Sequence, residues 1–169
     1  YTSLITQAAE NGLKIVINPG HRQIQKGKTE LKKIIRVAKI LILNKQEALD
    51  LTGLPPLNSE KKILRGLMVM GPQIVVMTDG ENGAFVNSND EMWHIPILKI
   101  KTVDPTGAGD AFSSGFLGNY IVNNDLKLAM QYGILNSAAV AEQYGAQANL
   151  LDKNQIEKLL SDAPELYKI

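Results

Sequence analysis

The sequence predicts an α/β fold in which helices cover both faces of a mostly parallel sheet, a three-layer doubly wound arrangement. Short apolar runs rich in β-branched residues occur at 13–17, 40–43 and 74–77. Turn residues bound each run, and helical patterns separate them. Continuous apolar strands of this kind are typical of parallel sheets that are buried on both faces. The alternation therefore indicates consecutive βαβ units.

In the first half of the chain, caps and turn residues mark the elements. Ser3 and Thr29 are suitable N-cap residues, and Gly12 can end the first helix in a left-handed conformation. The residues at 18–22 break the first strand, and those at 53–56 separate two helices. The predicted elements are a helix over 3–10, a strand over 13–17, a helix over 29–38, a strand over 40–43, and helices over 45–51 and 60–70.

The second half predicts one more parallel strand, a hairpin and three helices. The strand covers 74–77, and the runs 84–86 and 92–95, joined by a polar turn over 87–90, form an antiparallel hairpin. A long helix begins at Gly107, a second covers 126–144, and Asp152 caps a terminal helix. Within the hairpin, Trp93 is expected to pack and His94 to be exposed, with no chemical role for either.

Composition excludes several classes of protein. The chain has 169 residues, 44% of them hydrophobic, and a formal net charge of +1 without a basic tract, which argues against nucleic acid as a partner. It has no cysteine and only two distant histidines, so neither disulfides nor a zinc site is expected. No apolar run is long enough to span a membrane, and no signal peptide is recognisable. We expect one cytoplasmic domain.

A glycine segment that leads into a helix carries the strongest chemical signal. Ligands of parallel sheets gather beyond the carboxyl ends of the strands, here after residues 17, 43 and 77. At 102–112, Gly107 and Gly109 allow a tight turn and present bare N–H groups to an anion at the helix start. Asp110, in the first helical turn, is placed to accept a proton from a hydroxyl that attacks a phosphoryl group. The alternative is that Asp110 only complements the helix dipole.

The segment from Asp104 to Asp110 reads Asp-Pro-Thr-Gly-Ala-Gly-Asp. It resembles the second signature of the ribokinase-like (PfkB) carbohydrate kinase family. The resemblance implies a ribokinase-like fold, an anion hole formed by Gly107, Ala108 and Gly109, and Asp110 as the catalytic base. Thr106 is expected to contact the nucleotide.

Three further segments resemble the family in the same order. Asn44 and Glu47 match its Asn-x-x-Glu motif, which implies that Glu47 helps to hold Mg²⁺ through water beside bound ATP. Thr78, Gly80 and Gly83 match a strand-end Thr-x-Gly-x-x-Gly segment that approaches the ATP phosphates, and Asn136 matches an adenine contact. Without the resemblance, Asn44 is a helix cap, the glycine segment a turn, and the helix around Asn136 ordinary core packing.

The resemblance also implies a monovalent-cation site, such as a K⁺ site, formed by Asp104 and Thr106 together with the loop that contains Gly145 and Asn149. The segment at 18–22 departs from the family pattern, because Asn18 replaces the usual acid and Gly20 the usual asparagine. Arg22 in that segment is expected either to meet phosphate or substrate or to be a solvated charge.

The resemblance covers only the later part of the family's domain, and the chain does not begin with methionine. We therefore expect residues 1–169 to be the nucleotide-binding and catalytic part of a kinase, without the substrate and lid part. The implied reaction moves the ATP γ-phosphoryl group to a hydroxyl of a sugar or nucleoside. The incomplete sheet predicts a homo-oligomer or a complementary N-terminal half as partner. The alternative is a catalytically incomplete nucleotide- or partner-binding fragment.

Overall fold

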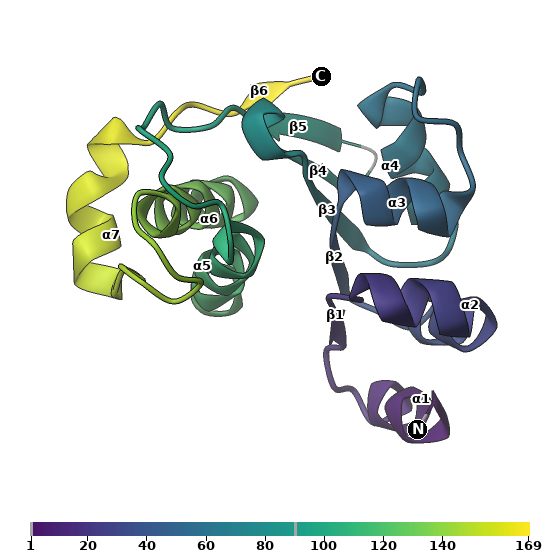
Figure 1. Cartoon of the computed structure of the whole chain (residues 1–169). Coiled ribbons are helices and arrows are strands. Elements are labelled where there is room, and N and C mark those ends of the chain that lie inside the picture. Colours follow the sequence, from purple (N-terminus) through teal and green to yellow (C-terminus); the bar gives the residue numbers. More distant parts are fainter. Residues whose placement is uncertain (1, 90) are drawn as a thin grey trace. The chain divides into compact units, whose positions relative to one another are not determined.

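The computed structural model describes residues 2–89 and 91–169, so Asp90 of the predicted turn lies outside the described residues. The chain forms two compact units. The first comprises Tyr1–Asp79, Phe85–Trp93 and Lys168–Ile169, and the second comprises Gly80–Ala84 and His94–Tyr167. The chain therefore passes from one unit to the other four times. The colours of Figure 1 follow the chain from its N-terminus to its C-terminus.

A six-stranded sheet runs in the order in which its strands occur in the sequence. Its strands are β1 (Val16–Ile17), β2 (Ile40–Asn44), β3 (Ile74–Thr78), β4 (Ala84–Ser88), β5 (Glu91–Ile95) and β6 (Tyr167–Lys168). β1 pairs with β2 and β2 with β3 in parallel, with Asn44 opposite Thr78 at the carboxyl end. The polar residues that end β2 and β3 thus lie side by side.

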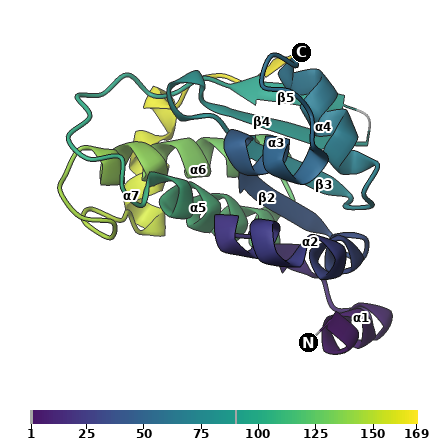
Figure 2. The same cartoon turned by 45° about the vertical axis from the view of Figure 1, so that its right-hand side comes forward.

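Among its described residues, the first unit contains four helices, three of which pack on one face of the parallel strands. The four are α1 (Thr2–Glu10), α2 (His21–Ile35), α3 (Lys45–Thr52) and α4 (Glu60–Met68). Leu41 and Leu43 of β2 and Val75 and Met77 of β3 alternate toward this face and join a core cluster with residues of α2, α3 and α4. Figure 2 shows these three helices on the same side of β2 and β3. α1 contributes no buried residue.

Two long helices dominate the second unit, whose elements are η1 (Gly80–Asn82), α5 (Ala108–Asn123), α6 (Leu126–Ala141), α7 (Lys153–Leu159) and η2 (Leu160–Asp162). α5 and α6 lie against each other in both views (Figures 1 and 2). A Cβ atom on Gly115 would lie 2.7 Å from the carbonyl oxygen of Tyr132, so only glycine permits this approach. Tyr132, Leu135 and Ile156 form a core cluster between α6 and α7.

Most predicted elements are confirmed, and five details are wrong. Asn87 and Ser88 belong to β4 rather than to the predicted polar turn. α2 begins at His21 rather than at Thr29, with a kink at Gly27, because the Gln23 side chain caps the N–H of Gly20 at 3.1 Å. β1 is restricted to the two residues that pair with Ile40 and Leu41. α6 ends at Ala141, whose carbonyl accepts hydrogen bonds from the backbone N–H groups of residues 103 and 104. The His94 side chain is buried, with 9% exposed.

Among the described residues, no helix combines the length and apolar character that a membrane span requires. The longest helices, α5 and α6, have 16 residues each.

Candidate functional site

The start of α5 is a tight loop that only glycine can form. Gly107 is the N-cap residue and has a left-handed φ of 84°. A Cβ atom there would lie 2.3 Å from the carbonyl oxygen of Ala146, so the loop also packs too closely for any side chain. The N–H of Ala108 bonds to the carbonyl of Pro105 at 3.1 Å, which closes the turn.

The N–H groups at this helix start are available to an anion. Those of Gly109 and Asp110 have no acceptor among the described residues. Unpaired N–H groups in the first helical turn carry the positive end of the helix dipole, here that of a 16-residue helix. The Asp110 side chain is exposed beside them. The arrangement pairs an anion-binding turn with a carboxylate that can accept a proton.

Asp104 joins this loop to the loop after α6. Its Oδ1 accepts a hydrogen bond from the N–H of Thr106 at 2.9 Å, and its Oδ2 accepts one from the N–H of Gly145 at 3.3 Å. Bonds from the hydroxyl and backbone N–H of Thr106, and then from Gly145, lower the pKa of the Asp104 carboxyl below its ordinary value of 3.8. Asn149, with a left-handed φ of 59°, donates from Nδ2 to the carbonyl of Ala139 at 3.0 Å.

The four residues predicted for the cation site thus belong to two loops that are held together. Within the described residues there is no group of three or more His, Cys, Asp or Glu side chains that could hold a metal. A monovalent cation does not require such a group, because backbone carbonyl oxygens replace its hydration shell. Asp104 uses its carboxylate to fix the two loops, so ligands from these loops would be carbonyl oxygens. The residues fit such an ion.

In the first unit, Asn44 and Glu47 cap α3. The Asn44 Oδ1 accepts from the N–H of Glu47 at 2.8 Å, and the Glu47 Oε2 accepts from the N–H of Asn44 at 3.0 Å. This capping box matches the structural alternative given for Asn44, that of a helix cap. The other carboxylate oxygen of Glu47 has no partner among the described residues. One carboxylate oxygen at a strand end fits Mg²⁺, which retains several waters and needs few protein ligands.

Sequence reasoning missed an ionic cluster at the same strand ends. Lys45 follows β2, Asp79 follows β3, and the Lys45 Nζ lies 2.8 Å from the Asp79 Oδ2. The Glu60 Oε1 lies 2.9 Å from the same nitrogen. The hydrogen bonds that Lys45 donates, first to Asp79 and second to Glu60, raise the pKa of Lys45. The only sequence signal for this cluster was positional, since Lys45 and Asp79 directly follow two strands that prove to be neighbours in the sheet.

The glycine loop after β3 follows the predicted phosphate contact Thr78, the last residue of that strand. Gly80 and Gly83 both have left-handed φ angles, 51° and 81°. A Cβ atom on Gly83 would lie 2.1 Å from the carbonyl oxygen of Ile95, so the loop packs directly on the backbone that follows β5. The loop geometry requires glycine at this position, as the motif does.

Asn136 lies in the core of the second unit, with 3% of it exposed. Its Nδ2 donates to the carbonyl of Ala111 at 2.8 Å and to the Ser114 hydroxyl at 3.1 Å, and its Oδ1 accepts from the N–H of Leu151 at 2.9 Å. These bonds tie α6 to α5 and to residue 151. They favour the packing alternative for Asn136 over an adenine contact, although the residue borders a cavity of about 340 Å³ between α5, α6 and α7.

The family comparison decides the identity of this arrangement. The model of the pfkB family of carbohydrate kinases matches residues 1–154. The chain belongs to the pfkB family. Cytidine kinase from Thermococcus kodakarensis is 31% identical over 145 residues, which are 84% of this chain and 51% of that protein. The chain thus spans about half the length of the curated relatives it matches.

Solved structures show the same fold. Nucleoside kinase from Methanocaldococcus jannaschii, a ribokinase-family member, has a TM-score of 0.76 at 26% identity, over 95% of this chain and 53% of that one. A ribokinase-type structure from Escherichia coli in complex with ATP and Mg²⁺ has a TM-score of 0.80 at 24% identity, over 93% and 51%. The pfkB chain therefore has a ribokinase-like α/β fold in a partial version, as its sequence predicts.

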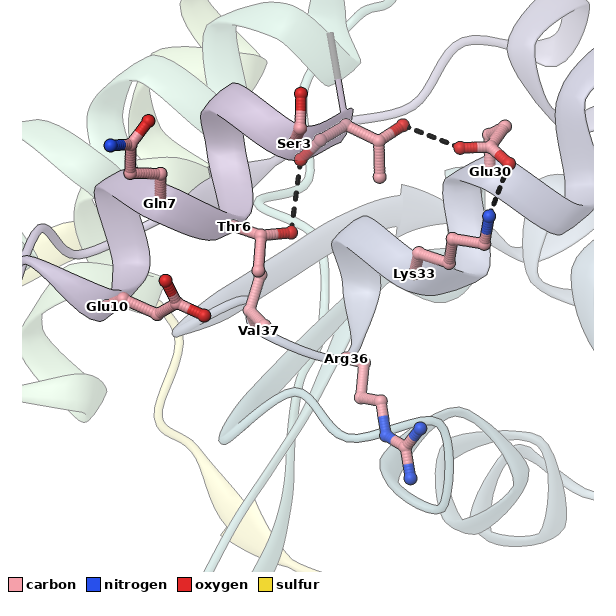
Figure 3. A pocket seen from close by; sticks show the side chains of 9 residues that line it. Ser3, Thr6, Gln7, Glu10, Glu30, Lys33, Arg36 and Val37 are labelled. Atoms are coloured by element: carbon pink, nitrogen blue, oxygen red, sulfur yellow. Dashed lines mark hydrogen bonds and ion pairs between the residues drawn. The ribbon is translucent and has the colours of Figure 1, made fainter.

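A broad hollow in the pfkB chain lies away from every predicted site residue. It has a volume of about 770 Å³ and lies between α1 and α2. Figure 3 shows Glu30 paired with Lys33 one turn further along α2. The hydroxyl of Thr2 in α1 donates a hydrogen bond to the Glu30 carboxylate at 2.8 Å. The residues that line the hollow include both acidic and basic side chains and are largely exposed, and none of them belongs to a glycine loop. Arg22 is exposed in the first turn of α2 and does not line it.

Proposed function

We propose that the protein to which this chain belongs transfers the γ-phosphoryl group of Mg·ATP to a hydroxyl of a sugar or nucleoside. The observation that carries the proposal is the start of α5. There, a left-handed Gly107 packed on Ala146 turns the chain so that unpaired N–H groups and the Asp110 carboxylate lie in one helical turn. Few arrangements serve both to hold phosphate charge and to remove a proton.

In the proposed reaction, the Asp110 carboxylate takes the proton of the acceptor hydroxyl. The hydroxyl oxygen then forms a bond to the γ-phosphorus, and the bond between that phosphorus and the β–γ bridging oxygen breaks, so that ADP leaves. The N–H groups of Gly109 and Asp110 stabilise the charge on the transferred group. Gly107 and Ala108 contribute by fixing the turn that aims these groups.

We assign the phosphates and Mg²⁺ to the carboxyl ends of β2 and β3. Asn44 and Thr78 lie opposite each other there, and one carboxylate oxygen of Glu47 has no partner among the described residues. When bound, Mg²⁺ would neutralise charge on the β- and γ-phosphates. Glu47 would hold it through water, and Gly80 and Gly83 would let the next loop approach the phosphates. A K⁺ ion bound by the loops at 104–106 and 145–149 would stabilise the loop that forms the anion site.

We propose that residues 1–169 supply the nucleotide-binding and catalytic part of the kinase, and that another segment supplies the substrate shelf and lid. Relatives are about twice as long as this chain. β1 has a neighbour on one side only in the described sheet, which leaves an edge for a complementary N-terminal half or a second copy. Mg·ATP is a cytoplasmic substrate, so we place the kinase in the cytoplasm.

The acceptor that we propose is a sugar or a nucleoside. The relative in Thermococcus kodakarensis is named a cytidine kinase, and the structural relative in Methanocaldococcus jannaschii a nucleoside kinase. The family itself is named for carbohydrate kinases. A sugar hydroxyl is common to both classes, and the residues that would choose between them are expected outside this chain.

One alternative has its own support. Asn44, Glu47 and Asn136 all make internal hydrogen bonds that a purely structural role would require. A chain of this kind would bind a nucleotide or a partner without catalysis. Nucleotide binding together with ADP formation distinguishes the two functions.

The test measures Mg·ATP binding by calorimetry and, in parallel, ADP formation with pooled sugars and pooled nucleosides. Binding with acceptor-dependent ADP formation supports a kinase that needs no second segment. Binding without ADP formation, restored when the N-terminal half of a pfkB relative is added, supports the catalytic part proposed here. Absence of nucleotide binding would contradict the proposal.

A further inference from the structure

His94 occupies a place that the site described above does not explain. It lies on β5 with only 9% of its side chain exposed, whereas a histidine on a hairpin strand is expected to reach solvent. Buried polar side chains require hydrogen-bond partners. The hydrogen-bond partners of His94 indicate its role.

Both ring nitrogens of His94 are hydrogen-bonded. Nε2 lies 2.6 Å from the carbonyl oxygen of Asn82, the residue before Gly83 in the glycine loop. Because a carbonyl oxygen only accepts, Nε2 carries the hydrogen in this bond. Nδ1 contacts the hydroxyl of Tyr167 at the start of β6, and the two rings meet edge to face with centroids 4.8 Å apart. All three residues belong to the second unit.

A second contact fixes the same loop against the same strand end. Gly83 packs so closely on the Ile95 carbonyl that a Cβ atom would be 2.1 Å away. His94 and Ile95 are consecutive, and so are Asn82 and Gly83. The glycine loop is therefore held at two adjacent points, by a hydrogen bond from a side chain and by a close backbone contact. Two such restraints leave the loop little freedom of rotation.

We propose that His94, oriented by Tyr167, is a positioning residue that fixes the glycine loop Gly80–Gly83 in its nucleotide-binding conformation. The proposal rests on the proposed function, in which this loop approaches the ATP phosphates. His94 does not touch the nucleotide. It acts through the carbonyl of Asn82, and the Tyr167 hydroxyl holds the imidazole in the tautomer that donates from Nε2.

This role has a signature that a purely structural role lacks. If a loop contacts the phosphates, its effect on binding affinity is larger for a ligand that carries more phosphate groups. Loosening it should weaken binding of ATP and ADP while leaving adenosine little affected. A general loss of stability would instead weaken all three ligands alike, through the folded fraction of the protein.

The experiment compares Tyr167→Phe and His94→Phe with the unmodified chain. Tyr167→Phe removes only the hydroxyl that orients His94, and His94→Phe keeps an aromatic ring but loses both hydrogen bonds. Tyr144→Phe is the matched control, because Tyr144 has 82% of its side chain exposed. Hydrogen exchange of the amides at 80–83 and calorimetric binding of ATP, ADP and adenosine are measured, with thermal unfolding to establish that each variant is folded.

We expect faster exchange at 80–83 and about 10-fold weaker ATP binding in His94→Phe, equivalent to about 1.4 kcal/mol. Adenosine binding should change less than about 2-fold, which is within about 0.4 kcal/mol. Tyr167→Phe should show the same pattern with a smaller effect, and Tyr144→Phe should show none. Unchanged exchange at 80–83 in both variants, or equal weakening of all three ligands, would overturn the proposal.

The proposal and the proposed function can fail separately. If the unmodified chain binds no nucleotide, the proposed function fails, while the exchange data still decide whether His94 fixes the loop. If nucleotide binds but His94→Phe alters neither exchange nor the phosphate-dependent affinities, the role of His94 fails and the proposed function stands. Should His94→Phe not fold, Tyr167→Phe alone decides, because it preserves the imidazole and its packing.

Discussion

Asp110 is the residue on which catalysis depends in the proposed mechanism. Asp110→Asn keeps the shape of the side chain and removes its capacity to accept a proton. We expect the turnover of the complete enzyme to fall by about 10²- to 10⁴-fold, the usual contribution of a general base. ATP affinity should stay within a few-fold, because the N–H groups of the turn are retained. Steady-state kinetics and calorimetry measure both, with the exposed Asp162→Asn as control. Equal losses of binding and turnover would contradict a role as base.

Glu47 allows a matched test of the magnesium assignment. In Glu47→Gln the amide oxygen can still accept from the N–H of Asn44, so the cap of α3 is preserved while the charge is lost. The Mg²⁺ concentration for half-maximal ATP binding should rise by about 10- to 100-fold, as for the loss of an indirect metal contact. Binding of ATP in metal-free buffer should change little. An unchanged Mg²⁺ titration would remove Glu47 from the site.

Asp104 predicts a dependence of stability on pH. Its pKa is lowered in the folded chain by Thr106 and Gly145, so its contribution to stability is present above the ordinary value of 3.8 and is lost as the pH falls through the folded value. Asp104→Asn should therefore be less stable than the unmodified chain at pH 7. The difference should shrink below about pH 3.8. Urea unfolding between pH 3 and 7 measures it, and a constant difference would contradict the assignment.

At the scale of the elements, the α5–α6 contact depends on where glycine lies. A Cβ atom on Gly115 would be 2.7 Å from the Tyr132 carbonyl, whereas one on Gly118 would meet nothing within 4 Å. Gly118→Ala should raise the free energy of unfolding by about 0.5 to 1 kcal/mol, because alanine loses less backbone entropy in a helix. Gly115→Ala should lower it by about 1 to 3 kcal/mol through overpacking. Chemical denaturation compares the two, and similar effects would show that the helices adjust freely.

The elements also show what the sequence could predict. The loop before α5 was predictable because its chemistry is local: Gly107 and Asp110 lie within one turn, and a left-handed residue there demands glycine. The start of α2 was missed because Gly20 has no side chain to signal a cap, and Gln23 supplies the bond instead. The burial of His94 and the ion pair of Lys45 with Asp79 depend on partners 73 and 34 residues away along the chain, which periodicity does not contain.

At the scale of the whole molecule, the two compact units are interleaved along the chain. Residues 80–84 of the second unit lie between β3 and the rest of β4, and the chain returns to the first unit at its last two residues. Thr78 and Gly80, one motif in the sequence, thus belong to different units. The motif connects a strand end to the loop that follows it along the chain, which is why its sequence spacing was informative although each unit has its own core.

The open edge of the sheet gives the last prediction. β1 pairs only with β2 among the described strands, and Val16 and Ile17 are half-buried, so its second edge offers backbone groups to another strand. We expect the chain of 18.5 kDa to self-associate at high micromolar concentration when no complementary half is present. Val16→Lys should shift the population toward monomer, because charged lysine on an edge strand opposes pairing. Leu57→Lys is the control, because Leu57 is 99% exposed in a loop outside the sheet, and its loss should leave association unchanged. Light scattering coupled to size-exclusion chromatography measures the mass. A monomer at every concentration would contradict pairing through β1 and leave a complementary half as the partner to test.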